Sequence, residues 1–351
     1  MGKRQYLFGV YVGRFQPFHN AHLELVLEAL ESVKKLIIIV GSAKNARTIK
    51  NPFTFDERVK MITEALIAAG VDKNRFIIKG VQDYFYNEQM WLNDIQSTVD
   101  KIAKGSQDIA LMGHIKDDSS YYLRSFPHWK FVATNVKSDI NATDVRVRYF
   151  GDDVFRVPLK DMVPAKVFNF LLEAKYDTRN EEYSSEYLAL KTEYDYIKAY
   201  KKEQEAYPWP IIFVTVDAVV IRSGHVLVIK RGGELGKGLY ALPGGHLNPD
   251  ETIFKATIRE LREETSIKLL DAILEDAAQE TTVFDYPARS LRGRTITHAT
   301  FFNLGKGQLP TIKAADDAAE AFWMPIHEAL AKPELFFEDH WHLLYHFTMR
   351  Y

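Results

Sequence analysis

The chain has 351 residues, too many for one hydrophobic core of ordinary size, so we expect two domains. Its 45 Lys and Arg residues nearly balance its 47 Asp and Glu residues, which excludes a global charge that would favour nucleic acid or an anionic membrane. The absence of cysteine excludes disulfides and thiolate chemistry, and without a signal segment or an apolar run of ~20 residues we expect a cytoplasmic protein.

The first half of the chain alternates predicted strands with predicted helices. Apolar runs predict strands at 6–12, 36–40, 76–81, 109–113 and 131–134, and helical spacing predicts helices from Leu23, after Thr54 and at 88–103. Strands that alternate with helices indicate a parallel sheet covered by helices on both faces. Ligands of such sheets bind beyond the carboxyl ends of the strands, so the residues that follow each strand are candidates for a site.

Polar residues follow three of these strands. They are Arg14, His19 and His22 after the first strand, Lys44 and Arg47 after the second, and His114, Lys116 and Asp117 after the fourth. His19 and His22 lie three residues apart where a helix begins, and the backbone N–H groups of a helix start already favour anions. Two imidazoles would add donors for the same oxyanions, although a pair of histidines alone equally fits helix capping or packing.

The ten residues from Gly13 to His22, G-R-F-Q-P-F-H-N-A-H, resemble the H-x-G-H signature of nucleotidyltransferases. This form of the signature is the one found in archaeal-type nicotinamide mononucleotide (NMN) adenylyltransferases. Residues 42–47, 51–54, 87–91, 113–118 and 140–146 resemble further segments of that family. Ala21 replaces the signature glycine, so its methyl group is expected to perturb the fit of the base. Asn141 replaces a serine, and this change still permits helix capping.

The resemblance implies an α/β, Rossmann-like domain at 1–172 that joins ATP and NMN into NAD and pyrophosphate. It implies catalytic roles for Arg14, His19, His22 and Arg146, and ATP or NMN contacts for Gly13, Phe15, Lys44, Arg47, Asn87, Trp91, Gly113, His114, Lys116, Asp117, Asn141 and Thr143. The largely dianionic phosphate of NMN can attack ATP without a strong base, so neutralising and aligning the phosphates suffices. Mg²⁺ would accompany ATP. Nicotinate mononucleotide, FMN and phosphopantetheine stay open as alternative acceptors.

A polar, tyrosine-rich segment at 173–207 is predicted as a partly helical linker. Its residues at helical spacing are Tyr187, Leu190, Tyr194 and Ile197. Pro208-Trp209-Pro210 then precedes a β-branched run at 211–221, which predicts a strand. Residues 226–230 would pair with that strand through a turn at Ser223-Gly224. These signals begin a second predicted domain, at 208–351.

The second domain contains a predicted strand, a tight loop and a helix that is rich in glutamate. Gly245 is followed by Glu251, Arg259, Glu260, Glu263 and Glu264. Glu260 and Glu264 lie four residues apart and therefore on one helix face, with Glu263 beside them. Like charges at this spacing destabilise a helix unless a cation lies between them, and oxygen ligands suit Mg²⁺ or Mn²⁺. A solvated helix would explain any single glutamate but not the coincidence of all these positions.

These positions resemble the Nudix box, G-x5-E-x7-R-E-U-x-E-E-x-G-U, in which U is a bulky aliphatic residue. Ser266 replaces the last glycine, which brings the backbone shape of the following loop into question. The resemblance implies an α/β/α fold with a mixed sheet and a divalent metal ion. It implies metal ligands at Gly245, Glu260, Glu263 and Glu264, with catalytic roles for Glu263 and Glu264.

Residues 281–294 are similar to the F-D-x-P-x-R…R-G-R segment of Nudix proteins that act on ADP-ribose. The similarity implies ADP-ribose contacts for Arg231, Gly244, Gly245, Arg289 and Arg294. A solvated hairpin would carry the same arginines, so both interpretations stay open. His340, His342 and His346 could suggest a metal, but their neighbours favour an amphipathic terminal helix.

Together the two halves resemble a known fusion of an NMN adenylyltransferase with a Nudix ADP-ribose pyrophosphatase. One half would make NAD, and the other would hydrolyse ADP-ribose to AMP and ribose 5-phosphate. The rival hypothesis is that the second half binds ADP-ribose or NAD as a sensor, against which its retained glutamates argue. The sequence predicts no nucleic-acid partner and no membrane, and it leaves a homo-oligomer open.

Overall fold

The computed structural model of the protein describes residues 6–114, 125–151, 157–177, 182–316 and 318–350. The chain forms two compact units, Met1–Lys191 and Thr192–Tyr351, and this division falls inside the segment 173–207 that is predicted as a linker. Within the described ranges, no helix is both long and apolar enough to span a membrane.

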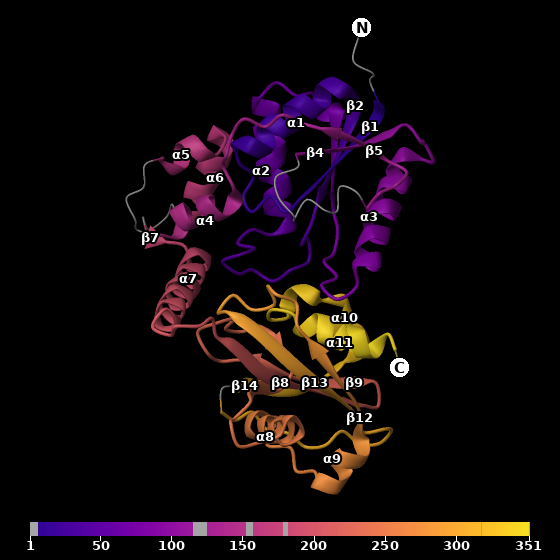
Figure 1. The fold of residues 1–351 in the computed structure, drawn as a ribbon, viewed down its shortest axis with the longest axis vertical. Coiled ribbons are helices and arrows are strands. Elements are labelled where there is room, and N and C mark those ends of the chain that lie inside the picture. Colours follow the sequence, from indigo (N-terminus) through magenta and orange to yellow (C-terminus); the bar gives the residue numbers. More distant parts are fainter. Residues whose placement is uncertain (1–5, 115–124, 152–156, 178–181, 317, 351) are drawn as a thin grey trace. The chain divides into compact units, whose positions relative to one another are not determined.

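The first unit is built on a five-stranded parallel sheet (Figure 1). Its strands are β1 (Tyr6–Gly13), β2 (Val33–Val40), β3 (Phe76–Gly80), β4 (Ile109–Gly113) and β5 (Lys130–Ala133), in the spatial order β3-β2-β1-β4-β5. Every neighbouring pair is parallel, which confirms the predicted sheet. The order reverses at β1, which lies between β2 and β4. The loops after β1 and β4 therefore diverge at the point where ligands of such sheets bind.

The helices of the first unit begin where the sequence supplies capping groups. They are α1 (Asn20–Ser32), α2 (Phe55–Ala68), α3 (Glu88–Ala103), α4 (Ala142–Phe150), α5 (Leu159–Met162) and α6 (Ala165–Lys175), with a short 3-10 turn at Lys73–Arg75. The side chains of Thr54, Asn87 and Asn141 accept hydrogen bonds from backbone N–H groups at the starts of α2, α3 and α4. These bonds satisfy donors that have no partner inside a helix. Asn141 thus caps α4, as expected of its replacement of serine.

One hydrophobic cluster of this unit lies between the sheet and α3. Leu92, Ile95 and Val99 recur at helical spacing on α3, and they belong to one buried cluster with Val10 of β1 and Leu111 of β4. Burial of each large aliphatic side chain stabilises the fold by roughly 1.5–3 kcal/mol. This packing holds the sheet rigid and so fixes where its carboxyl ends lie.

After α6, the strand pair β6 (Tyr176–Asp177) and β7 (Glu182–Tyr183) leads into the long helix α7 (Ser185–Gln204). Tyr187, Leu190 and Ile197 of α7 are buried, which confirms the helical spacing in the predicted linker. The hydroxyl of Tyr187 donates to the carbonyl oxygen of Tyr149 at 3.1 Å, so the start of α7 is docked on the first unit.

The second unit contains a seven-stranded mixed sheet. Its strands are β8 (Ile212–Arg222), β9 (His225–Arg231), β10 (Tyr240–Ala241), β11 (Gly244–His246), β12 (Ala278–Phe284), β13 (Arg294–Asn303) and β14 (Ala318–Pro325). β8 runs parallel to β13 and antiparallel to β9 and β11. Ser223 and Gly224 connect β8 to β9 with left-handed φ values of 47° and 76°, the turn geometry that suits a tight hairpin. The predicted hairpin is therefore confirmed.

Helices cover both faces of this sheet, as the predicted α/β/α fold requires (Figure 1). They are α8 (Ile253–Thr265) and α9 (Asp271–Ala277) on one face and α10 (Ile326–Ala331) and α11 (His340–Thr348) on the other, with a 3-10 turn at Pro333–Leu335. Successive residues of a strand point to opposite faces. Phe302 of β13 accordingly packs in the cluster that contains Leu261 of α8, whereas Phe301 stacks on Phe347 of α11 with ring centroids 5.5 Å apart.

The residue after α8 shows how the chain tolerates its departure from the Nudix box. Ser266 adopts a left-handed conformation, with φ 49° and ψ 27°, and its N–H donates to the carbonyl oxygen of Arg262 at 2.8 Å. This is the helix end that glycine favours, because any side chain costs energy there. The backbone turn of the box is thus kept even though its glycine is absent.

Candidate active sites

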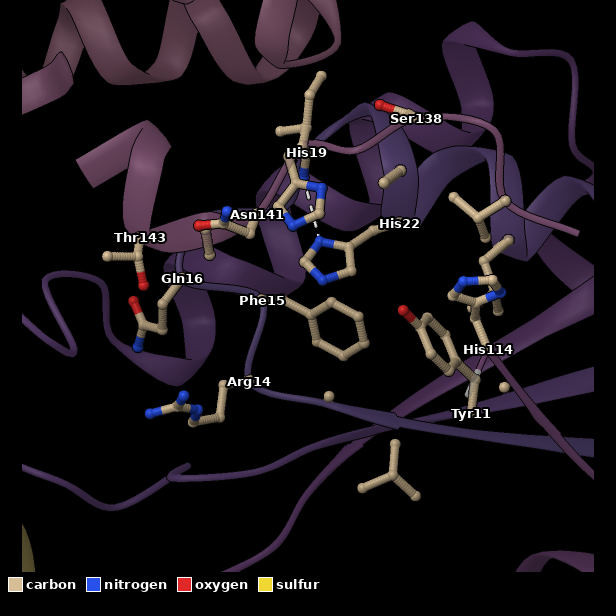
Figure 2. Close-up of a pocket in the computed structure, with 18 of the residues that line it drawn as sticks. Tyr11, Arg14, Phe15, Gln16, His19, His22, His114, Ser138, Asn141 and Thr143 are labelled. Carbon is tan, nitrogen blue, oxygen red and sulfur yellow. Dashed lines mark hydrogen bonds between the residues drawn. The ribbon is translucent and has the colours of Figure 1, made fainter. Parts of the chain in front are cut away.

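A pocket in the first unit lies at the carboxyl ends of β1 and β4 (Figure 2). Predicted site residues that line it are Gly13, Arg14, Phe15, His19, His22, Gly113, His114, Asn141, Thr143 and Arg146. They come from the ends of β1 and β4 and the loops that follow, from the first turn of α1, and from α4 with its cap. Ala21, the residue that replaces the signature glycine, lines the same pocket.

The two histidines of the signature form a stacked pair at the start of α1. Their ring centroids are 3.5 Å apart, and the backbone N–H of His19 donates to Nδ1 of His22 at 3.2 Å. Nδ1 of His22 is therefore an acceptor, and the proton of the neutral ring lies on Nε2. Burial and the nearby His19 hold the pKa of His22 well below its usual value. His22 is thus neutral at pH 7 and offers a hydrogen-bond donor rather than a positive charge.

The positive charge of the pocket comes from Arg14 and Arg146. Arg146 donates from Nη1 to the carbonyl oxygen of Gln16 at 2.8 Å and from Nη2 to the hydroxyl of Thr143 at 3.1 Å. Burial, together with the nearby Arg14, lowers the pKa of Arg146 to about 10, so Arg146 stays charged at pH 7. Two guanidinium groups that disfavour one another in this way would be stabilised by an anion between them.

Other predicted binding residues do not line this pocket. Arg47 donates to Glu57 and to the carbonyl oxygen of Pro52, each at 2.8 Å, so its guanidinium is engaged at the start of α2. Asn87 caps α3, and Trp91 of this helix packs against the buried cluster. Lys44 is exposed, while Lys116 and Asp117 lie outside the described residues. Ligand contacts from these six positions stay predictions.

Several pocket residues were not predicted from the sequence. Gln16 joins the loop after β1 to Phe53, donating from Nε2 to its carbonyl oxygen at 2.8 Å and accepting from its N–H at 3.0 Å. Ser138 also lines the pocket, and its N–H donates to Glu24 of α1 at 3.2 Å. Gln16 lies inside the signature decapeptide and could have been found there. Ser138 is 114 residues from its partner, and no local pattern marks it.

In the second unit, Arg259 of α8 connects the glutamates of the box. It donates to both carboxylate oxygens of Glu251, at 2.9 and 2.6 Å, and from Nη1 to Glu260 at 2.7 Å and Glu263 at 2.8 Å. Glu263 is the residue four positions after Arg259, so this contact joins successive turns of α8. One guanidinium faces three carboxylates, so the cluster keeps a negative charge.

The glycine pair before α8 lets two carboxylates approach the backbone. The N–H of Gly244 donates to Glu264 at 2.8 Å, and a Cβ on Gly245 would lie 2.5 Å from Oε1 of Glu260. Burial raises the pKa of Glu264 to about 8, and the nearby Glu260 acts in the same direction. Burial likewise raises the pKa of Glu260. Two crowded carboxylates of this kind fit a divalent cation between them.

The expected metal-binding set is nevertheless not preassembled. Among the residues that the structure describes, no three His, Asp or Glu side chains are grouped so that they could hold an ion. Glu263 is turned toward Arg259, and its side chain is 46% exposed. Nη1 of Arg259 donates to both Glu260 and Glu263, so an ion held by these two carboxylates would compete with this nitrogen. The ligand set of Gly245, Glu260, Glu263 and Glu264 therefore stays a prediction.

Arg289 has a different environment from the one expected for a ligand contact. Its side chain is 4% exposed, and Nε and Nη2 donate to the two carboxylate oxygens of Asp339 at 2.9 and 2.8 Å. Both side chains of this bidentate pair are buried, so the guanidinium forms an internal ion pair. Asp339 is thus an internal partner that sequence similarity does not show, and the ADP-ribose contact of Arg289 stays a prediction.

Two further arginines and two histidines that the sequence singled out lie elsewhere in this unit. Arg294 is half-buried and donates to the carbonyl oxygen of Asp285 at 2.6 Å. The guanidinium carbon of Arg231 lies 4.2 Å from the ring centroid of Phe337. The ADP-ribose contacts of Arg231 and Arg294 stay predictions. His340 and His342 are buried within α11, which confirms the terminal helix.

Comparison with known proteins assigns a family to each unit. Residues 10–188 match the cytidylyltransferase-like family, and residues 212–347 match the NUDIX domain. A nicotinamide/nicotinic acid mononucleotide adenylyltransferase of Acinetobacter baylyi is 41% identical over 151 residues, which are 43% of this chain and 78% of that protein. A nicotinamide-nucleotide adenylyltransferase of Saccharolobus solfataricus is 32% identical over 174 residues, 50% of this chain and 95% of that protein.

A crystal structure from Francisella tularensis resembles the whole chain. It is a bifunctional NMN adenylyltransferase/ADP ribose pyrophosphatase complexed with AMP and a manganese ion, with a TM-score of 0.89 and 38% sequence identity. The similarity covers 98% of this chain and 99% of that chain. Enzymes of both families depend on divalent cations. The chain therefore belongs to the family of bifunctional enzymes in which an NMN adenylyltransferase domain of the cytidylyltransferase-like type is joined to a Nudix hydrolase domain.

Proposed function

We propose that the first unit transfers the adenylyl group of ATP to NMN and releases pyrophosphate, with Mg²⁺ accompanying ATP. The observation that carries this proposal is the meeting of Arg14, Arg146 and the paired histidines at the carboxyl ends of β1 and β4. An oxygen of the NMN phosphate would form a bond to the α-phosphorus of ATP, and the bond from that phosphorus to the pyrophosphate would break. The products are NAD and pyrophosphate.

The residues of the pocket would act by charge and position. Arg14 and Arg146 would neutralise the phosphate oxygens, and Nε2–H of His22 would donate to them without adding charge of its own. Donors that are fixed before the reaction lower its barrier because they need no reorganisation when charge moves. No residue has to remove a proton from the attacking phosphate, because that group is already largely ionised at pH 7.

The acceptor is tested by offering ATP with NMN, nicotinate mononucleotide, FMN or phosphopantetheine and separating the products. We expect NAD to form from NMN at the highest kcat/KM. Activity with nicotinate mononucleotide would be consistent with the proposal, since the printed name of the Acinetobacter baylyi relative includes both pyridine nucleotides. A strong preference for FMN or phosphopantetheine would overturn the assignment of NMN.

For the second unit, we propose hydrolysis of ADP-ribose to AMP and ribose 5-phosphate. A bound Mg²⁺ or Mn²⁺ would neutralise the diphosphate and lower the pKa of a water molecule. Glu260 and Glu264 would hold the ion beside Gly245, because their carboxylates already lie against the backbone of this loop. Glu263 or Glu264 would accept the proton of the water. The support is the likeness to the Francisella tularensis enzyme over both units.

A sensor that binds ADP-ribose without hydrolysing it is the alternative for this unit. Replacing Glu264 with Gln distinguishes the two functions, because the amide keeps the size of the side chain but cannot ionise to bind a cation or accept a proton. We expect hydrolysis to fall by about 10²–10⁴-fold while ADP-ribose still binds. Absence of hydrolysis by the unmodified chain with either cation would favour the sensor. Action in the cytoplasm, which fits both alternatives, is part of the proposal, and a homo-oligomer stays open.

A further inference from the structure

The largest fully buried side chain of the described residues is an arginine that no motif marked. Arg58, near the start of α2, is 1% exposed. Its Nη1 donates to the carbonyl oxygens of Arg14 and Gly41, each at 2.7 Å, and its Nη2 donates to that of Ser42 at 2.9 Å. Its Nε donates to the carbonyl oxygen of Thr54 at 3.2 Å. One guanidinium thus joins the loop after β1, the loop after β2 and the start of α2.

The two loops have left-handed residues at the points that Arg58 contacts. Phe15 follows the carbonyl of Arg14 and has φ 53°, while Ser42 follows the carbonyl of Gly41 and has φ 50°. A left-handed conformation costs an L-residue roughly 1–2 kcal/mol. Hydrogen bonds from a charged donor are stronger than those between neutral groups, so Arg58 is well placed to offset this cost in both loops.

The loop after β2 is held from its other side by Asp83. Oδ1 of Asp83 accepts from the N–H of Ser42 at 3.1 Å, and Oδ2 accepts from the Ser42 hydroxyl at 2.6 Å and from Nδ2 of Asn45 at 3.0 Å. The carbonyl of Gly41 and the N–H of Ser42 belong to one peptide group, and they point in opposite directions because that group is planar and trans. Arg58 and Asp83 therefore fix both ends of the same peptide group.

This peptide group lies beside a residue of the pocket. A Cβ built on Gly41 would lie 3.7 Å from Cγ of Arg14, so the stem of the Arg14 side chain runs along Gly41. The next part of the loop after β1 is held by Arg146, which donates to the carbonyl oxygen of Gln16 at 2.8 Å. The backbone that carries Arg14 is consequently bound by Arg58 on one side and by Arg146 two residues later.

We propose that Arg58 is a positioning residue for adenylyl transfer, which sets the distance between the loops after β1 and β2 and thereby places Arg14 against the phosphates of ATP. The proposal rests on the function proposed for the first unit. Arginine suits this role better than lysine, because its planar fork can reach four carbonyl oxygens from three nitrogen atoms. Lysine would keep the charge but has a single nitrogen, so it would lose part of this geometry.

The test compares Arg58→Lys with Arg75→Lys in the full chain. Arg75 is a matched control because it also donates to three carbonyl oxygens, those of Leu30 at 2.7 Å, Val33 at 2.9 Å and Lys34 at 2.7 Å. It binds the amino end of β2, away from the pocket. The measurements are kcat and KM for ATP at saturating NMN, the Kd for ATP, the unfolding temperature, and ADP-ribose hydrolysis by the same preparation.

For Arg58→Lys we expect KM and Kd for ATP to rise about tenfold, which corresponds to about 1.4 kcal/mol. For Arg75→Lys we expect the unfolding temperature to fall without a change in KM or Kd for ATP. Hydrolysis of ADP-ribose should be unchanged in both variants. If Arg58→Lys does not fold, Asp83→Asn tests the other end of the same peptide group, and the KM for ATP should again rise.

The proposal is overturned if Arg58→Lys keeps KM and Kd for ATP within twofold of the unmodified chain, or if the two arginine variants change in parallel. For Asp83→Asn, an unchanged KM for ATP would have the same meaning. A separate result would contradict the function proposed for the first unit, and not the role of Arg58. If the unmodified chain makes no dinucleotide from ATP and NMN, the assignment of NMN as the acceptor is wrong. The Kd for ATP in the variants then decides the role of Arg58 by itself.

Discussion

The two candidate sites use arginine in opposite ways. In the first unit, Arg58 and Arg146 donate to backbone carbonyl oxygens, which are neutral, so the positive charges persist in and around the pocket. In the second unit, Arg259 donates to three carboxylates, and negative charge prevails. Both sites would act on phosphate anhydrides. The partner of the arginine therefore decides whether a site receives the anion directly or needs a cation first.

The largest expected effect comes from breaking the buried bidentate pair of Arg289 with Asp339. Replacing Asp339 with Ala would remove the two hydrogen bonds that the buried guanidinium donates to it, and the contact with Asp217 is longer, at 3.9 Å, so we expect the free energy of unfolding of the second unit to fall by about 3–5 kcal/mol. Denaturant titration followed by loss of ADP-ribose hydrolysis measures this change. As a control, Glu320→Ala removes an exposed pair with Lys230 and should change stability little. If Asp339→Ala is as stable as the unmodified chain, Arg289 does not depend on this pair, and ligand binding by Arg289 is favoured.

The next effect concerns the cationic pocket. Replacing Arg146 with Met removes a positive charge from the phosphate site, and we expect kcat for adenylyl transfer to fall by about 10²–10³-fold. Arg148→Met is the matched control, because Arg148 lies on the same helix and donates to the carbonyl oxygen of Val157 at 2.7 Å. Hydrolysis of ADP-ribose should be unaffected in both. A similar loss of kcat in the two variants would show that helix α4 matters for stability and that Arg146 has no special role.

A smaller effect is expected from the neutral histidine that accompanies these arginines. The pKa of His22 in the folded chain lies below 6.5, so below that pH the unfolded state binds a proton that the folded state does not bind. Stability of the first unit should therefore fall as the pH falls from 6.5 toward the lowered pKa. His22→Gln should show a flatter dependence of unfolding temperature on pH. A steeper dependence in the variant would mean that His22 is charged in the folded chain.

The smallest effect tests the glutamate helix of the second unit. Ser266 adopts a left-handed conformation at the end of α8, so Ser266→Gly should raise the free energy of unfolding by about 0.5–1 kcal/mol. Ser266→Ala keeps the unfavourable conformation and should bring no gain. Thermal unfolding of the two variants provides the comparison. Destabilisation by glycine would show that the serine side chain, and not the backbone, holds this turn.

Local signals were sufficient to predict the parallel sheet of the first unit and several of its helices. Hydrophobic spacing found every strand of the parallel sheet, and the capping residues Thr54, Asn87 and Asn141 mark where α2, α3 and α4 begin. The signature from Gly13 to His22 located the pocket, because its residues follow one strand end and stay together in space. The Nudix box likewise located the glutamate cluster on one helix.

Long-range partners could not be predicted in this way. Arg58 and Arg289 are joined to groups 44 and 50 residues away, and no periodicity relates such positions. The position of Arg289 in a motif-like segment suggested a ligand contact, but nothing in that segment indicates that Arg289 pairs with Asp339. Arg58 had no motif at all. Residues whose role depends on one distant backbone or carboxylate group are therefore the ones that sequence analysis misses.

The most direct test of the account is a crystal structure of the full chain with Mn²⁺ and a non-hydrolysable ATP analogue. We predict that the triphosphate lies within hydrogen-bond distance of Arg14, His22 and Arg146 in the first unit. We also predict that Mn²⁺ in the second unit contacts Glu260 and Glu264. Triphosphate bound away from Arg146, or manganese bound away from these glutamates, would contradict the account.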